Sequence, residues 1–246
     1  MDEFNLTMIA DRLESMEETI ISRILDRMQY KRNSAVYSTD KVFIKDMSPL
    51  DYMHKLSEQI FAQLGKFSVA EEKPFFRDTD LSINKNIVQK KEHFCSNILN
   101  GINMTSEIKK HYISFVKISC EDGDDSEYGS SAEADIAALT AISKRIHYGS
   151  FYVAESKFLS ESQKYVDAIK KRDENAVRAL LTRKEIEEKI VLRVKEKCDK
   201  IQDAYTSKLR KKIDSQLIGN FYENTIIPLT KDGETLYLFR RCENEN

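Results

Sequence analysis

The chain has 246 residues, of which 41% are hydrophobic and 33% charged, and its formal net charge is −2. A nearly neutral chain lacks the basic field that attracts nucleic acid or an anionic membrane, so neither is an expected partner. The sequence contains only 7 glycines and 3 prolines, and because tight turns need these residues, long helices are favoured over sheets. The composition therefore predicts an all-α protein, with residues 1–246 as a single domain.

The N-terminal segment and the cysteines indicate the cellular compartment. The N-terminus is acidic and lacks the basic and apolar runs of a secretory signal, and no apolar run approaches the roughly 20 residues of a membrane span. The four cysteines have neither metal-ligand nor disulfide-framework spacing. They are Cys95, Cys120, Cys198 and Cys242. We therefore expect a cytoplasmic protein with reduced thiols and no bound metal.

Apolar residues that recur every three or four positions predict a series of amphipathic helices. Leu6, Ile9 and Leu13 begin the first such stripe, and Ser48 with Pro49 provides an N-cap and a first-turn proline for the next helix. The segments between the helices are expected to be irregular, with short helices inside the long connection at 68–103. The predicted helices span residues 4–30, 49–67, 105–119, 130–157, 161–171, 173–181, 182–205 and 215–241.

Three local signals predict where long helices begin or are interrupted. Ser130 with Glu133, and Thr182 with Glu185, have the spacing of capping boxes, which satisfy the free N–H groups at a helix start. Pro228 should interrupt the last helical region because proline lacks the N–H that a helix interior needs.

The candidates for chemistry are charged or hydroxyl side chains inside apolar helix patterns. The sequence has no phosphate-binding glycine loop, no GxSxG and no HExxH. Arg145 interrupts an apolar face, Glu187 follows Arg183 by one helical turn, and Thr230 and Glu234 share a face if their segment is helical. Taken alone, such residues are more often surface or salt-bridged side chains, so their spacing leaves the function open.

Three further motifs occur along the chain. They are residues 9–21 (IADRLESMEETII), 143–158 (SKRIHYGSFYVAESKF), and 227–231 with 237–241 (IPLTK and YLFRR). In sequence, order and spacing they resemble the motifs of the chorismate mutases of fungi and plants. The resemblance implies an all-helical homodimer that rearranges chorismate to prephenate, on the way to phenylalanine and tyrosine, without a metal or cofactor.

The resemblance also implies a role for each of five residues. Arg145 matches the arginine that binds a substrate carboxylate, Lys157 the lysine that reaches the ether oxygen, and Glu187 the glutamate that binds the substrate hydroxyl. Thr230 and Glu234 match a pair near the carboxylate and the ether oxygen, where Glu234 must be protonated to donate a hydrogen bond. This set suits the rearrangement of a dianion, which needs cationic clamps and a donor at the ether oxygen.

Three positions depart from the family pattern. Ala10 stands where an arginine is expected, and Arg183 stands where asparagine is usual. Arg183 either supplies the cation lost at position 10 or only pairs with Glu187 and blocks the pocket. Arg145 and Lys157 are 12 residues apart rather than 11, which adds about 100° of rotation. A π-bulge would restore the phase of Lys157, whereas a straight helix would point it away from the cavity.

The family also binds aromatic amino acids as effectors, through a Gly-Ser pair and basic residues. Gly129 and Ser130 match the pair, but Gly65-Lys66 replaces two arginines and Glu133 replaces a threonine. Because an added carboxylate repels the carboxylate of an amino acid, we expect control by tyrosine or tryptophan to be weakened or lost.

Three functions are compatible with this sequence. The first is a working chorismate mutase. The second is a catalytically impaired descendant that keeps the helical dimer as a binding or structural module, since the departures fall inside the predicted site. The third is an unrelated helical scaffold with a chance match. Convergence of Arg145, Lys157, Glu187 and Glu234 on one cavity favours the family, and an open pocket with two cations favours catalysis.

Overall fold

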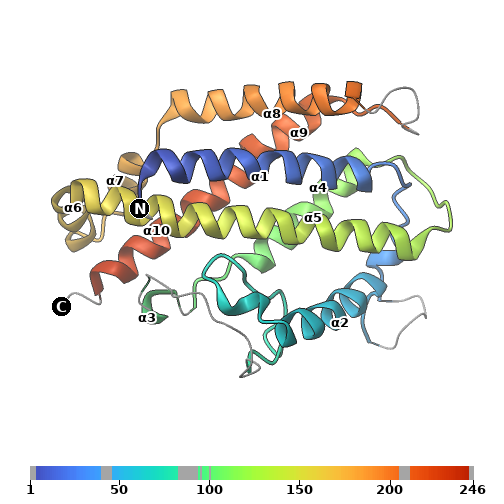
Figure 1. Cartoon of the computed structure of the whole chain (residues 1–246), viewed down its shortest axis with the longest axis horizontal. Coiled ribbons are helices and arrows are strands. Elements are labelled where there is room, and N and C mark those ends of the chain that lie inside the picture. Colours follow the sequence, from blue (N-terminus) through green and yellow to red (C-terminus); the bar gives the residue numbers. More distant parts are fainter. Residues whose placement is uncertain are drawn as a thin grey trace.

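The long helices of the chain lie side by side in one bundle (Figure 1). The computed structural model describes residues 4–39, 46–82, 94, 96–99, 101–204 and 211–243, and no strand occurs among these residues. Helix α1 (Leu6–Arg27) packs along α5 (Tyr128–Tyr148), and α10 (Ile227–Glu243) runs diagonally to both. The predicted all-α class is therefore confirmed.

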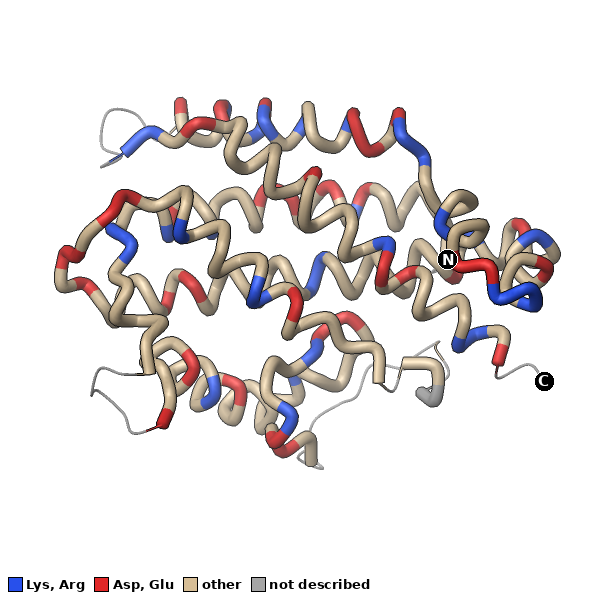
Figure 2. Tube along the Cα trace, turned by 180° about the vertical axis from the view of Figure 1, so that it is seen from behind, with Lys and Arg blue, Asp and Glu red and all other residues tan. Residues whose placement is uncertain are grey.

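The remaining elements cover or connect these helices. Two of them, η1 and η2, are 3₁₀ turns, whereas η3 and η4 are π-helical turns. Basic and acidic residues interleave along the helices (Figure 2). In chain order the elements are η1 (Ser34–Tyr37), α2 (Pro49–Gln63), η2 (Lys66–Ser68), α3 (Ser96–Leu99), α4 (Thr105–Ser119), η3 (Gly149–Val153), α6 (Ala154–Lys170), α7 (Glu174–Leu181), α8 (Lys184–Ala204), α9 (Ser215–Phe221) and η4 (Tyr222–Ile226).

The cysteines and the long connection fall partly outside the described residues. Cys120, Cys198 and Cys242 are buried free thiols, whereas nothing is described for Cys95. Within the predicted irregular stretch 68–103, the described part contains the single short helix α3. No helix in the described part of the chain combines the length and the apolarity required to cross a membrane.

The predicted start of α5 at a capping box is wrong. The helix begins at Tyr128, two residues before Ser130, so Ser130 and Glu133 already lie inside its first turns. Asp125 accepts the N–H of Glu127 at 3.0 Å and thereby orders the chain just ahead of the helix. The helix therefore starts without a side-chain cap, two residues earlier than the local sequence signal indicates.

The second predicted capping box is also wrong. The hydroxyl of Thr182 donates a hydrogen bond to the carbonyl oxygen of Arg178 (2.8 Å) at the end of α7, and α8 begins only at Lys184.

The predicted helix 161–171 is the second part of α6, where Glu161 has a non-helical backbone conformation (φ −141°, ψ 41°) that kinks the helix.

The interruption predicted near Pro228 is the π-turn η4, which ends immediately before α10. Proline lacks an N–H, and its ring clashes with the carbonyl four residues earlier in a regular helix. A π-turn adds one residue and relieves this clash without ending the helix. The chain therefore continues into α10, which carries the C-terminal site residues.

One buried ion pair joins the end of α1 to α5. Arg27 Nε lies 2.7 Å from Asp135 Oδ1, and the two side chains are only 1% and 0% exposed. The hydroxyls of Tyr37 and Tyr112 donate to the same carboxylate at 2.6 and 2.9 Å. The remaining guanidinium N–H groups donate to the carbonyls of Lys31 and Arg32 in the segment after α1, to Cys120 Sγ and to the hydroxyl oxygen of Tyr37. Both charges are therefore compensated inside the core, which burial requires.

Candidate active site

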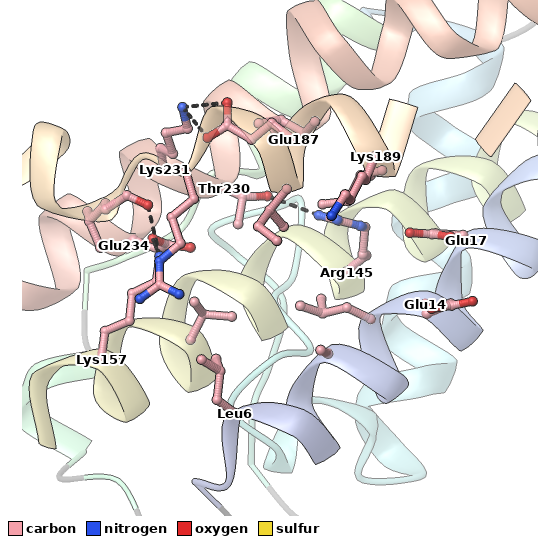
Figure 3. A pocket seen from close by; sticks show the side chains of 18 of the residues that line it. Leu6, Glu14, Glu17, Arg145, Lys157, Glu187, Lys189, Thr230, Lys231 and Glu234 are labelled. Atoms are coloured by element: carbon pink, nitrogen blue, oxygen red, sulfur yellow. Dashed lines mark hydrogen bonds and ion pairs between the residues drawn. The ribbon is translucent and has the colours of Figure 1, made fainter. Parts of the chain in front are cut away.

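A cavity of about 380 Å³ lies among α1, α5, α6, α8 and α10 (Figure 3). Its apolar wall is formed by Leu6, Ala10, Leu13, Val153, Leu181, Ile186, Ile190 and Ile227. The six residues singled out in the sequence as catalytic or substrate-binding candidates all line the same cavity. They are Arg145, Lys157, Arg183, Glu187, Thr230 and Glu234.

The helix between Arg145 and Lys157 is not straight. Residues Gly149–Val153 form a π-helical turn, which absorbs the extra residue of this segment and keeps Lys157 on the cavity side. The alternative of a straight helix that points Lys157 away is therefore wrong. Ser150 stabilises the turn, because its hydroxyl lies 2.7 Å from the carbonyl oxygen of Ile146 and 3.2 Å from that of Thr230.

Two glycines allow α10 to approach this turn closely. A Cβ atom at Gly233 would lie 2.0 Å from Ser150 Oγ, and a Cβ atom at Gly149 would lie 2.7 Å from Thr230 Cγ2. Both distances are shorter than side chains can pack, so a larger residue at either position would separate the helices. The glycines therefore set how closely α10 packs against the turn η3. The segments on the two sides of this contact carry Arg145, Lys157, Thr230 and Glu234.

Arg145 is a buried cation with unused hydrogen-bonding capacity. It is 3% exposed, its Nη1 donates to Thr230 Oγ1 at 3.3 Å, and its guanidinium lies 5.6 Å from the ring centroid of Tyr222. Its Nε is buried and has no hydrogen-bond partner among the described residues. A desolvated guanidinium with a free N–H is suited to bind an anion.

Lys157 and Glu234 lie together in the cavity. Lys157 Nζ is 3.4 Å from Glu234 Oε2 and donates to the carbonyl oxygen of Leu181 at 3.0 Å. Glu234 is 5% exposed. Burial raises the pKa of the Glu234 carboxyl above its ordinary value, although Lys157, Lys231 and Arg145 act in the opposite direction. The carboxyl therefore holds its proton to a higher pH than an exposed glutamate does.

Glu187 pairs with Lys231 rather than with Arg183. Glu187 Oε1 lies 2.8 Å from Lys231 Nζ, so the predicted alternative in which Arg183 only pairs with Glu187 is not found. Arg183 is exposed, lines the cavity and interacts electrostatically with Glu161 and Tyr165 of α6. Lys231 belongs to the motif at 227–231, but its sequence position gave no indication that it holds Glu187.

Charged residues at the interface of α1 and α8 were not found from the sequence. Arg193 binds the Glu17 carboxylate through two N–H groups, at 2.9 and 2.6 Å, and lies 3.3 Å from Glu14. Lys189, one helical turn before Arg193, also lines the cavity. These pairs depend on how α1 and α8 are aligned, which the periodicity of neither helix reveals.

The three residues expected to bind an effector do not meet within one chain. Lys66 shares a small hollow with Thr140 and Ser143 of α5, whereas Gly129 and Ser130 are exposed at the start of that helix. From Ser130 to Thr140 the helix rises about 15 Å. Lys66 therefore lies too far along α5 to contact a ligand bound at Gly129 and Ser130 of the same copy.

The charged side chains of the cavity leave an excess of cations. The ion pairs among them are Lys157–Glu234, Lys231–Glu187, Arg193–Glu17 and Arg193–Glu14. Arg145, Arg183 and Lys189 form no ion pair with a residue that the structure describes. Unpaired cations in a partly apolar cavity suit a small ligand with more than one negative charge.

Comparisons with known proteins agree with this arrangement. No family model matches the chain, but it is 36% identical to the chorismate mutase of Pichia angusta, over 96% of this chain and 87% of that protein. The chloroplast chorismate mutase of Zea mays has a similar structure, with a TM-score of 0.88 and 32% identity, over 97% of this chain and 96% of the other. The chorismate mutase of Candida albicans in complex with L-Trp gives a TM-score of 0.89 and 31% identity, over 99% and 94% of the two chains. The similarity in sequence and in structure extends over nearly the whole length, and the chain therefore belongs to the chorismate mutase family.

Proposed function

We propose that this chain rearranges chorismate to prephenate in the cavity of Figure 3. Membership of the family supports the reaction. The assignment of the cavity depends on one observation: Lys157 and Glu234 lie 3.4 Å apart, and the buried Arg145 lines the same space. An open cavity with unpaired cations favours an enzyme over a catalytically impaired binding module.

Arg145 and Glu187 hold the substrate in this proposal. The free Nε of Arg145 donates to one substrate carboxylate, while Thr230 Oγ1 at 3.3 Å orients the guanidinium. Glu187 accepts a hydrogen bond from the substrate hydroxyl, and Lys231 fixes the orientation of the Glu187 carboxylate. Holding a flexible substrate in its compact, reactive shape lowers the entropic part of the barrier.

Lys157 and Glu234 stabilise the transition state. As the carbon–oxygen bond of chorismate breaks, negative charge develops on the ether oxygen, and donors placed there bind the transition state more strongly than the ground state. The Lys157 ammonium and the protonated Glu234 carboxyl are the two donors. No nucleophile is required, because the rearrangement is unimolecular.

Arg183 remains a proposed substrate-binding residue at the rim of the cavity. Its exposed guanidinium attracts a dianion toward the opening. In addition to Lys164, its charge lowers the pKa of Glu161, and it acts against the burial that raises the pKa of Tyr165, so it lies near α6, the helix that also carries Lys157.

We expect the turnover rate to decline as pH rises through neutrality. Burial raises the pKa of Glu234, and only its protonated form donates to the ether oxygen. Ionisation at higher pH therefore removes a donor and adds a like charge next to the developing one. The measurement is kcat for chorismate from about pH 5 to pH 9. Glu234→Gln keeps an uncharged N–H donor and should flatten the profile, whereas a flat wild-type profile would contradict the role of Glu234.

We also propose that the chain forms a homodimer through α2. Tyr52, Leu56 and Ile60 recur every four residues along one face of this helix, and Leu64 follows at its C-cap. These four side chains are 42%, 43%, 58% and 71% exposed. Such a row of large apolar side chains is typical of a protein–protein contact. In the expected homodimer, a second copy of the chain covers this row of side chains.

Introducing negative charge on this apolar face should separate the two copies of the chain. Leu56→Glu combined with Ile60→Glu places carboxylates in the contact, where they cannot be solvated. Analytical ultracentrifugation should give twice the chain mass of 28.6 kDa for the wild type and a single chain for the double variant. Leu192→Glu, at an exposed apolar position of α8, is the matched control and should remain dimeric. A monomeric wild type would refute the proposal.

We propose that aromatic amino acids affect the activity of this chain only weakly. The structure of the Candida albicans relative contains L-Trp, but Glu133 here is exposed one helical turn after Gly129, where its carboxylate repels that of an amino acid. Added L-Trp or L-Tyr should therefore change the turnover rate by less than about twofold. Glu133→Thr should strengthen the response, and a large response of the wild type would show that this explanation is incorrect.

A further inference from the structure

The α1 side of the cavity lacks the cation expected at position 10. Ala10 lines the cavity there and contributes no charge. The proposed substrate carries two carboxylates, and a buried carboxylate needs a positive partner. Arg145 provides one such partner, so the second carboxylate requires another cation from this chain.

The alignment of α1 and α8 identifies the residue that faces Ala10. The two helices run side by side in the same direction (Figure 1), and Arg193 of α8 pairs with Glu14 of α1. One helical turn earlier on each helix are Lys189 and Ala10. Since both helices rise by the same distance per turn, Lys189 lies across from Ala10, and both residues line the cavity.

The other cations of this region are already engaged or lie elsewhere. Arg193 is bound to Glu17 through two hydrogen bonds, and Lys231 is bound to Glu187. Lys189 forms no ion pair among the described residues, and Figure 3 shows its side chain extending from α8 toward the part of the cavity that contains Arg145. Arg183 interacts with α6 instead, as described above.

We propose that Lys189 binds the second substrate carboxylate in place of the arginine missing at position 10. This assignment rests on the proposed function, since it assumes a dicarboxylate ligand. The cation has moved from α1 to the facing position of α8, so the charge is kept at the same end of the cavity. The long, flexible lysine side chain allows its ammonium to reach across the space that Ala10 leaves open.

The test is steady-state turnover of chorismate by the full chain. Lys189→Ala should lower kcat/KM about 10- to 100-fold, the loss expected for a hydrogen bond to a charged group. The effect should fall mainly on KM, because a carboxylate clamp acts in the ground state and the transition state alike. Adding Ala10→Arg to this variant should restore most of the loss, which a merely structural role of Lys189 would not explain.

One control variant and the turnover of the wild type separate the possible results. Lys200→Ala, an exposed lysine of α8 outside the cavity, should leave kcat/KM unchanged. If the wild type turns over chorismate but Lys189→Ala does so equally well, the assignment of Lys189 is overturned while the proposed function stands. A large loss in Arg183→Ala in that case would assign the second carboxylate to Arg183. A wild type without turnover would overturn the proposed function together with this inference.

Discussion

Replacing Lys157 with alanine should lower kcat for chorismate about 10²- to 10³-fold, the usual cost of removing one donor to a developing oxyanion. Lys157 is anchored by the carbonyl oxygen of Leu181 at 3.0 Å and lies 3.4 Å from Glu234. Its loss removes the ammonium from the ether oxygen and also leaves the buried Glu234 without its nearest cation. The decrease should appear in kcat and in kcat/KM alike, because the contact with the ether oxygen is made mainly in the transition state.

The matched control for this variant lies on the same helix. Lys164 of α6 is 61% exposed and pairs with the nearby Glu161 outside the cavity, so Lys164→Ala should retain the turnover of the wild type. Circular dichroism of both variants would establish that they keep the helical fold. If Lys157→Ala kept more than about a tenth of the wild-type kcat, Lys157 could not be the main donor to the ether oxygen.

Arg27→Met should destabilise the fold by about 3–5 kcal/mol, the effect of breaking a buried ion pair on one side only. The substitution leaves Asp135, which is 0% exposed, without its cation. It also removes the hydrogen bonds, 3.0 and 3.1 Å long, that Arg27 donates to the carbonyl groups of Arg32 and Lys31 just after α1. Because this pair joins α1 to α5, the loss should lower the stability of the bundle as a whole.

Urea denaturation followed by circular dichroism measures this effect. Arg23→Met is the control, since Arg23 lies one turn earlier on α1 and forms an exposed pair with Asp26, with side chains 51% and 59% exposed. Exposed pairs contribute about 1 kcal/mol or less. Asp135→Asn added to Arg27→Met should recover part of the loss by removing the uncompensated charge. Equal unfolding midpoints for Arg27→Met and Arg23→Met would contradict the role of the buried pair.

The sequence was most informative where local signals dominate. The helix expected over 105–119 is α4 (Thr105–Ser119) with the same ends. The 12 residues between Arg145 and Lys157 left two alternatives, a straight helix or a π-bulge, and the structure has the π-turn at Gly149–Val153. Such features depend on a few neighbouring residues and can be predicted without the rest of the fold.

The sequence was least informative where two distant segments meet. The loop ahead of α5 is held by a distant segment, because Asp125 accepts hydrogen bonds from the N–H of Lys31 and the side-chain amide of Asn33, both 2.8 Å long. Lys231 and Lys189 entered the site only once the alignment of α8 with α10 and α1 was known. Charged residues on a helix surface have no periodic signal that distinguishes a solvated side chain from one that faces a cavity.

We expect this cavity to convert chorismate to prephenate despite the alanine at position 10. The most direct test is to incubate the purified chain with chorismate at mildly acid pH and to follow both compounds over time. Prephenate should appear as chorismate disappears, in equal amounts and without an added cofactor or metal. The enzymatic rate should exceed the uncatalysed rate by at least about 10⁶-fold. A folded protein that leaves chorismate to react at its uncatalysed rate would contradict the proposed function.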